Sequence, residues 1–583
     1  MCPYKKHIKS VDMDGPVCST DTQSVQFVKK DNGFRGQSHL SHIHNLGSEP
    51  LKSLTLGQLL EDAANKYEKT DAIVSVWDNR RVTYKEVLHQ ADKLAAGFLS
   101  LGLEKGDRIG LWAPNIVEWV IVFYASARAG LVTVAINPNF KALDLEHVLN
   151  VSGTKALVCL EQYKSINFYD TLKCLLPELE MCSTKRLSSA KCPALKFVVV
   201  ISNAPLRGAH NYAEVLNAVD TNTVEGYHVN PEETGVIQLS SGTTGRAKAI
   251  CLSHSQVVNS SYFLGKRLGF DKAQHIICVQ PPLFHVFGVV GSISNAAHFG
   301  ATLVFPAPMY NSTENLKALE NERCTLIYGT PTMYIDLINV QTQLKKKLYA
   351  QKAFIGAAPF SPELLAKIKD KLNVQQILPG YGATETSGAV FVSTSSGLTV
   401  GQRINDGYII DHAEVKVVDN CRNIVPFGIP GELYVRGYYT MKGYLDDPDS
   451  TREVLDCENW YKTGDQFILY EDGSGKVVGR MKDMIIRGGE NISPTEIEKL
   501  LESHPDILEA QVIGVKHERL GEEVCACVRL KAGVELTLDS IREFCDRKIS
   551  GYKMPTQLRI MESFPRTPSG KVQKFLLRQQ FSE

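Results

Sequence analysis

Between about residues 50 and 480, apolar runs of strand length alternate with segments of helical pattern. This alternation is typical of α/β layers with largely parallel sheets, because parallel strands are usually joined by a helical crossover. At 583 residues the chain exceeds what a single hydrophobic core normally holds. We therefore expect an α/β fold with a large multi-subdomain N-terminal domain of layered sheets and helices, and a small, mobile α+β C-terminal domain.

The domain limits follow from local composition. Residues 1–48 form an N-terminal extension that we expect to be disordered or to act in targeting, residues 49–480 the large domain and residues 481–583 the small one. Glycine and charge cluster at Glu471–Gly489, which favours a boundary there. Ser493 with Glu496 has the pattern of a capping box, with Pro494 at the first helical position. This pattern predicts a helix at Pro494–Leu501 and a capping role, not a catalytic one, for Glu496.

Composition excludes some classes of partner. Lys plus Arg and Asp plus Glu both number 64, so no overall field favours nucleic acid or an anionic membrane. The 14 cysteines show no metal-ligand spacing, and Cys525 and Cys527 would share one face of a strand, which favours core packing. We expect a reducing compartment. Arg128 and Gly130 interrupt the apolar stretch Trp119–Ile136, which predicts a buried helix followed by a strand and no transmembrane segment.

Targeting signals are weak. Acidic residues, Asp12, Asp14 and Asp21 among them, make the N-terminal segment a poor match to an Arg-rich, acid-poor mitochondrial presequence. There is no signal-peptide core, so we expect no secretion. The sequence ends in Phe581-Ser582-Glu583, which is no peroxisomal address.

The loop Ser240–Lys248 follows the apolar run Gly235–Leu239, which predicts a buried strand. The loop is rich in hydroxyls and glycines, and glycine lets backbone N–H groups turn toward phosphate oxygens. Lys248 would then lie against the anionic charge. The spacing is not that of a Walker A motif, because the lysine follows Gly245 by three and precedes Ala249. The alternative is a polar surface loop between a strand and a helix.

A second polar cluster is Leu378–Glu385. Tyr381 offers a face on which a purine could stack, and Glu385 is a hard oxygen ligand suited to Mg²⁺. The same run could equally be a turn with a helix cap.

Two later segments add charged groups. Asp465 ends the run Trp460–Asp465 and could accept from both hydroxyls of a ribose, while Arg480 supplies a forked donor. Near the C-terminus, Lys571 lies on a glycine-containing turn within Pro565–Lys571. Each segment alone is weak evidence for a nucleotide site. The occurrence of all of them together, in this order, is strong evidence.

This set of motifs resembles the adenylate-forming superfamily of acyl-CoA synthetases, luciferases and peptide-synthetase adenylation domains. The resemblance runs from about residue 55 to the C-terminus. The segments that look most like medium-chain acyl-CoA synthetases are Tyr328–Met333, Lys482–Ile492 and Gly521–Cys527.

The resemblance implies ATP-dependent ligation of a fatty acid, of medium chain length, to coenzyme A through an acyl-adenylate, with release of AMP and pyrophosphate. The substrates would be the fatty acid, ATP and CoA, with Mg²⁺, and no nucleic acid. By resemblance the large domain binds AMP and the acyl group, while the small domain carries the catalytic lysine. The implied location is the mitochondrial matrix, with the cytoplasm as the alternative.

Residue roles carry over by position. The residues implied in ATP binding are Ser240, Ser241, Gly242, Thr243, Thr244, Gly245, Arg246, Ala247, Lys248, Gly356, Ala357, Tyr381, Asp465, Arg480 and Lys571. The implied catalytic residues are Lys571, Thr384 and Glu385, the last also as metal ligand. The implied acyl-site residues are His285, Gly288, Thr330 and Met333, and those of the hinge and CoA channel are Lys482, Gly488 and Gly489.

Alternatives remain at two levels. The chain could be an adenylating enzyme with a non-CoA acceptor, as in luciferases, or a non-catalytic nucleotide-binding relative. His285 could be structural, and Lys482 a solvated linker lysine. The family usually has proline where Ala247 stands and glycine where Ala249 stands. We expect a cost at Ala249 only if its backbone needs a positive φ.

Overall fold

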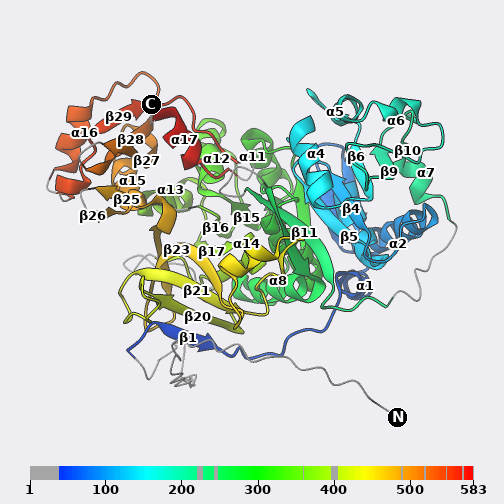
Figure 1. Ribbon diagram of the computed structural model, residues 1–583, viewed down its shortest axis with the longest axis horizontal. Helices are drawn as coiled ribbons and strands as arrows, with labels where there is room; N and C mark the ends of the chain where they lie inside the picture. Colours follow the sequence, from blue (N-terminus) through cyan, green and yellow to red (C-terminus); the bar gives the residue numbers. More distant parts are fainter. Residues whose placement is uncertain are drawn as a thin grey trace, which may run out of the picture.

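A computed structural model describes residues 39–219, 228–241, 247–358, 360–394, 405–487, 490–517, 520–546, 548–549, 551–567 and 570–581. The architecture is mixed α/β, with a large domain coloured blue to yellow and a small domain coloured orange to red (Figure 1). The fold class expected from the sequence is confirmed. Among the described residues, no helix combines the length and the apolar character that a membrane-spanning helix needs.

Two large sheets dominate the first domain. The eight-stranded sheet has the order β10-β9-β6-β4-β5-β11-β12-β22 and is parallel up to β11. Its strands are β4 (Arg108–Trp112), β5 (Val132–Ile136), β6 (Ala156–Leu160), β9 (Phe197–Ile201), β10 (His210–Asn211), β11 (Thr234–Ser241), β12 (Ala247–Ser253) and β22 (Gly443–Tyr444). A short hairpin, β7 (Gln162–Tyr163) and β8 (Ile166–Asn167), lies outside it.

The nine-stranded sheet has the order β19-β18-β17-β16-β15-β13-β14-β2-β3, with a parallel centre. Its strands are β2 (Asp71–Ser75), β3 (Arg80–Thr83), β13 (Ile276–Val279), β14 (Thr302–Phe305), β15 (Leu326–Gly329), β16 (Lys352–Gly356), β17 (Gln376–Ala383), β18 (Gly388–Val392) and β19 (Tyr408–Ile409).

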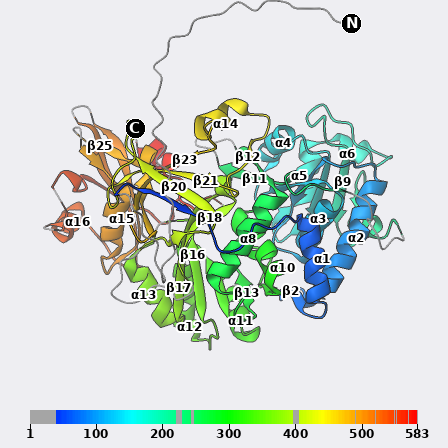
Figure 2. The ribbon, with the colours of Figure 1, turned by 90° about the horizontal axis from the view of Figure 1, so that it is seen from below.

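Helices fill the space between and around these sheets. Their bounds are α1 (Leu56–Lys66), α2 (Tyr84–Ser100), α3 (Val117–Arg128), α4 (Ala142–Val151), α5 (Phe168–Leu175), α6 (Glu178–Met181), α7 (Tyr212–Leu216), α8 (His254–Leu268), α9 (Val286–Gly288), α10 (Asn295–Phe299), α11 (Ser312–Asn321), α12 (Pro331–Leu344), α13 (Pro362–Lys371) and α14 (Pro448–Val454). Helix α8 contacts β11 and β12 of one sheet and β18 of the other, and lies near the centre of the molecule (Figure 2).

The longest apolar stretch folds as the sequence predicts. It supplies most of α3 and the strand β5, and Trp119, Phe123 and Tyr124 are at most 2% exposed. Helix α3 is apolar on every side because it packs against α1 and α2 as well as against β4 and β5. A helix without a polar face is stable only when buried in this way.

The remaining sheets divide between the two domains. An antiparallel five-stranded sheet joins β1 (His42–Asn45), β20 (Ala413–Val418), β21 (Gly431–Gly437), β23 (Tyr461–Leu469) and β24 (Gly475–Arg480). The small domain contains β25 (Ile485–Arg487), β26 (Glu490–Ile492), β27 (Ile507–His517), β28 (Gly521–Leu530) and β29 (Gln557–Ile560), with α15 (Pro494–Glu502), α16 (Leu538–Cys545) and α17 (Lys574–Phe581). We propose the domain boundary between residues 480 and 481, at the end of β24.

Three local expectations need correction. The expectation that all of residues 1–48 form an extension was wrong for β1, which pairs with β20 and buries Ile43 completely; residues 1–38 lie outside the described residues. The helix after Ser493 was correct, but its capping box was wrong: the Ser493 hydroxyl donates to the Val478 carbonyl at 2.8 Å. Glu496 pairs instead with Lys553 at 2.7 Å.

The third correction concerns the loop Ser240–Lys248. The alternative of a loop between a strand and a helix was wrong, because β11 and β12 pair antiparallel, with Ser241 opposite Ala247. Ala249 lies inside β12 opposite Leu239, so it needs no positive φ, and its side chain is 3% exposed against the core. Residues 242–246 lie outside the described residues.

Other predictions are confirmed. Ser361 caps α13 by accepting from Leu364 N–H at 3.3 Å, with Pro362 at the first helical position. Cys525 and Cys527 both lie in β28 and are fully buried in one apolar cluster of the small domain.

Gly382 sets the approach between β17 and β18, and its replacement tests this. A Cβ at Gly382 would lie 1.8 Å from the Gly388 carbonyl oxygen, which is backbone and cannot rotate away. We expect Gly382→Ala to cost about 1–3 kcal/mol, in the range of overpacked cores, and to lower the midpoint of thermal unfolding. Gly551→Ala is the control, because a Cβ there meets open space. An unchanged midpoint for Gly382→Ala would contradict this packing.

Candidate active site

The carboxyl ends of β16 and β17 form one wall of the candidate site. Gly356 and Gly380 are opposite each other in the register, and a Cβ on Gly356 would lie 2.7 Å from the Gly380 carbonyl oxygen. Ala357 follows with a φ of 70°, so the chain turns sharply at the strand end. Ala357 and Tyr381 border the same cavity. The open edge above the two strand ends is where α/β sheets commonly bind ligands.

Asp465 is the electrostatic centre of this wall. It is 6% exposed and lies on β23, opposite Arg480 on β24. Tyr381 Oη donates to Asp465 Oδ2 at 2.7 Å, and Arg480 forms an ion pair with the same carboxylate, its Nε 3.0 Å from Oδ1. Each carboxylate oxygen has a second lone pair, so Asp465 can still accept from two ligand hydroxyls.

The neighbouring groups fix the protonation states. Burial, together with Asp465, raises the pKa of Tyr381 well above its usual value, so its hydroxyl remains a donor. The Asp465 carboxylate raises the pKa of Arg480, which therefore remains a cation. The carboxylate thus has one neutral hydroxyl donor and one cation beside it.

A turn within β23 aims Asp465 into the cavity. The Asp465 N–H donates to Thr463 Oγ1 at 3.1 Å, and Gly464 between them has a φ of 67°, which favours glycine. The Gly464 N–H donates to Glu432 at 3.3 Å. The sequence did not single out Thr463 or Glu432, since their roles depend on pairing across the sheet.

Glu385 lies just beyond β17, in the short turn Thr384–Thr386. Tyr444 Oη donates to Glu385 Oε1 at 3.2 Å, and the Tyr444 ring lies 4.5 Å from Lys248 Nζ. Burial raises the pKa of Tyr444, so it donates and does not ionise. Tyr444 thus connects the strand that follows the phosphate-loop motif to the candidate metal ligand, a connection that the sequence did not reveal.

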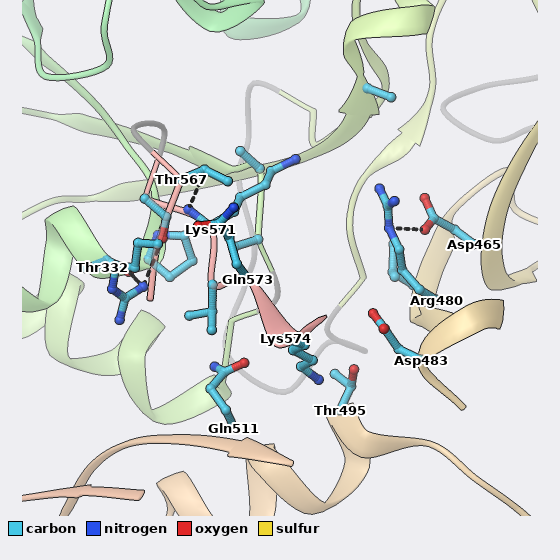
Figure 3. A pocket seen from close by; sticks show the side chains of 18 of the residues that line it. Thr332, Asp465, Arg480, Asp483, Thr495, Gln511, Thr567, Lys571, Gln573 and Lys574 are labelled. Atoms are coloured by element: carbon cyan, nitrogen blue, oxygen red, sulfur yellow. Dashed lines mark hydrogen bonds and ion pairs between the residues drawn. The ribbon is translucent and has the colours of Figure 1, made fainter. Parts of the chain in front are cut away.

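Lys571 reaches this site from the small domain. Its side chain borders the same cavity as Glu385, Asp465 and Arg480, and Figure 3 shows it across the cavity from the Arg480–Asp465 pair. Burial and the nearby Arg480 lower the pKa of Lys571, while Asp465 and Glu385 act in the opposite direction. The cavity measures about 1610 Å³ and is lined by both domains.

His285 borders this cavity near Lys571 and begins α9. Its Nδ1 accepts from the Phe287 N–H at 3.3 Å, which assigns the ring proton to Nε2. Burial, with a smaller contribution from Lys571, lowers the pKa of His285 to about 3, so the ring is neutral near pH 7. A π-helical segment, Val289–Ser294, follows, and such segments are frequent at functional sites.

The described residues that border the cavity do not include the other predicted acyl-site residues, Gly288, Thr330 and Met333. A Cβ on Gly288 would lie 2.4 Å from Leu283 Cα, so this glycine permits close packing. Thr330 Oγ1 caps α12 at 3.5 Å from the Met333 N–H, and both residues are at most 5% exposed. Thr332, on the first turn of α12, borders the cavity.

The remaining predicted residues divide by position. Lys482 borders the cavity, and burial with the neighbouring Arg480 lowers its pKa. Ser240, Ser241 and Ala247 belong to the strands that flank the loop motif. The predicted site residues outside the described part of the chain are Gly242, Thr243, Thr244, Gly245, Arg246, Gly488 and Gly489.

Comparison with known proteins identifies the family. Residues 60–445 match the model of the AMP-binding enzyme family, and residues 496–571 match that of the AMP-binding enzyme C-terminal domain. The medium-chain acyl-CoA ligase ACSF2, mitochondrial, of Danio rerio is 40% identical over 92% of this chain and 90% of its own. The Homo sapiens protein of the same name is 38% identical over 93% of this chain and 90% of its own.

A solved structure shares the fold. The anthranilate CoA ligase AuaEII in complex with anthranoyl-AMP superimposes with a TM-score of 0.81 at 23% identity, covering 91% of this chain and 98% of that one. The family models span most of both domains, and the relatives cover nearly the whole chain. The chain belongs to the AMP-binding enzyme family.

Proposed function

We propose that this protein is an acyl-CoA synthetase that joins a medium-chain fatty acid to coenzyme A. The observation that carries the proposal is the meeting, in one cavity, of Lys571 from the small domain with Glu385 and the Asp465–Arg480 pair from the large domain. The names of the relatives at 38–40% identity supply the acyl class and the acceptor.

In the first half-reaction a carboxylate oxygen of the fatty acid attacks the α-phosphorus of ATP. The bond from the α-phosphorus to the bridging oxygen breaks, and pyrophosphate leaves. In the second, the CoA thiolate attacks the acyl carbonyl carbon and AMP leaves. The two reactants of the first step are both anions, so fixed positive charge in a site that excludes water lowers the barrier.

The described residues divide this work. Asp465 accepts from the ribose hydroxyls and is held for this by Tyr381 and Arg480. Lys571 places a cation between the carboxylate and the α-phosphate, and Thr384 supplies a hydroxyl next to Glu385 in the same cavity. The neutral His285 ring donates from Nε2 at the acyl end, without adding charge.

Glu385 fits a metal that arrives with the nucleotide. Among the described residues no donor to Glu385 Oε2 is found, and no cluster of three or more His, Cys, Asp or Glu side chains could hold a metal alone. Mg²⁺ is typically held by one or two carboxylates together with substrate phosphates. Bound there by Glu385, it would neutralise phosphate charge.

We also propose that Lys482 lies in the hinge about which the small domain moves between the half-reactions, because it lies in the short turn Met481–Asp483 that follows β24. The location we propose is the mitochondrial matrix, after the names of the relatives. Recovery of the native protein in the cytosolic fraction alone would contradict it.

The substrate prediction uses a series of saturated fatty acids from octanoate to dodecanoate. With ATP, Mg²⁺ and CoA, we expect release of AMP and formation of thioesters, both measured by chromatography. Fatty-acid-dependent pyrophosphate exchange without thioester would indicate a different acceptor. Absence of both activities would indicate a non-catalytic nucleotide-binding protein.

A second prediction concerns Lys571. We expect Lys571→Ala to lower the rate of acyl-adenylate formation roughly 10²–10³-fold, as for loss of one donor to a transition-state charge, with little change in ATP affinity. Lys516→Ala, at an exposed position on β27 of the same domain, is the control. Normal adenylation by Lys571→Ala would remove this residue from the mechanism.

The pH profile of the same enzyme gives an independent readout. The cationic form of Lys571 is the active one, and its pKa lies below the ordinary value of 10.5. As pH rises through this lowered pKa, the cation is lost. We therefore expect kcat/KM for ATP in adenylation to decrease with rising pH, and the decrease to begin before pH 10.5 is reached. Arginine does not deprotonate in this range. We therefore expect Lys571→Arg to be slower but to lack this alkaline fall, and persistence of the fall would assign it to another group.

A further inference from the structure

Arg566 contacts three separate parts of the structure from one side chain. It lies after β29 in the small domain, five residues before Lys571. Its Nη1 donates to the Gly570 carbonyl at 2.9 Å and to Thr332 Oγ1 of the large domain at 3.0 Å. Its Nη2 pairs with the carboxylate of Glu509 on β27. The rigid fork of a guanidinium is suited to such simultaneous contacts.

The contact between Arg566 and Gly570 restrains the peptide unit that joins Gly570 to Lys571. The Gly570 carbonyl and the Lys571 N–H belong to the same planar peptide unit, so holding both ends fixes its orientation. Arg566 holds the carbonyl oxygen, and Thr567 Oγ1 accepts from the Lys571 N–H at 3.1 Å. The Thr567 N–H in turn donates to the Lys571 carbonyl at 2.7 Å. Arg566 and Thr567 together therefore set the direction in which the Lys571 side chain leaves the backbone.

The large domain presents acceptors to this turn. Thr332 lies on the first turn of α12, and Figure 3 shows it on the same side of the cavity as Lys571. A Cβ on Gly570 would lie 3.3 Å from Thr330 Oγ1, so the turn approaches the start of α12 closely. Asp336 lies one helical turn beyond Thr332. Burial raises the pKa of its carboxyl group, and the charges of Arg529 and Arg566 act in the opposite direction. The small domain thus brings two cations to a helix end that carries a hydroxyl and a carboxylate.

A purely structural role in neutralising Glu509 explains less. Arg529 also pairs with Glu509, at 3.5 Å, so the buried carboxylate has a second cationic partner. Neutralising Glu509 requires neither the bond to Thr332 nor the bond to Gly570. These two bonds link the large domain to the peptide unit that precedes the Lys571 side chain.

We propose that Arg566 is a positioning residue, which holds the Gly570–Lys571 peptide against α12 through Thr332 and so directs the Lys571 ammonium into the active site. The proposal rests on the proposed function for the step that Lys571 assists. In this proposal Arg566 acts through Lys571 and does not itself contact a substrate.

The test compares Arg566→Gln, Thr332→Val and the double variant. In fatty-acid-dependent ATP–pyrophosphate exchange we expect Arg566→Gln to lower kcat roughly 10- to 100-fold, the range for loss of a charged hydrogen bond, with KM for ATP nearly unchanged. Thr332→Val should lower kcat less. The double variant should be no slower than Arg566→Gln, because both changes remove the same link. Arg566→Lys, which keeps the charge, should recover part of the loss.

A second measurement does not depend on activity. Hydrogen exchange of the peptide spanning residues 566–573 reports the bonded amides of Thr567, Gly570 and Lys571. We expect faster exchange there in Arg566→Gln and Thr332→Val. The control is Arg559→Gln, an exposed arginine of β29 that, within the described part of the chain, hydrogen-bonds to Leu558 and Gln557 and lies 5.4 Å from the Phe581 ring.

The outcomes separate this inference from the proposed function. Wild-type kcat in Arg566→Gln, or losses that multiply in the double variant, would overturn the positioning role and leave the function intact. If the wild-type protein shows no exchange of pyrophosphate, the proposed function fails. Hydrogen exchange then decides alone: faster exchange in both variants supports the docking through Arg566, and unchanged exchange overturns it.

Discussion

The buried carboxylate of Asp465 joins two sheets of the large domain. Tyr381 belongs to the nine-stranded sheet, whereas Asp465 and Arg480 belong to the antiparallel five-stranded sheet. A buried charge is tolerated only when it is paired and hydrogen-bonded, so the two sheets must meet in one relative position. The same position aligns the strand end that carries Glu385 with the turn that carries Asp465. Asp465 therefore contributes to the alignment of the large-domain half of the site, together with backbone hydrogen bonds between the two sheets such as that from the Asp406 N–H to the Gly475 carbonyl at 2.8 Å.

The sequence predicted those features whose cause is local. Hydrophobic periodicity gave the strand before the loop motif and the buried helix at Trp119. The Ser361-Pro362 pair predicted the start of α13, because a cap and a proline act within one helical turn. Resemblance over many motifs predicted the site residues, and four of them, Lys571, Glu385, Asp465 and Arg480, border one cavity.

Features that depend on distant partners could not be predicted in this way. Strand β1 exists because β20 offers it an edge, hundreds of residues away. Ser493 has the local pattern of a cap, but its hydroxyl finds the Val478 carbonyl, which tertiary structure brings within reach. The contact of Arg566 with Thr332 likewise spans the two domains. In each case the partner is distant in the sequence, so the contact that forms depends on the tertiary structure.

The position of Tyr444 has an electrical consequence. Lys248 lies over the face of its ring, and Glu385 accepts from its hydroxyl, so an aromatic side chain stands between opposite charges. The ring occupies the space between the cation and the anion, so the two do not form a direct ion pair. The two charges stay separate, and both residues border the cavity. Under the proposed function, a triphosphate and its metal ion would meet charges that are already apart, so the binding step would not include the cost of separating them.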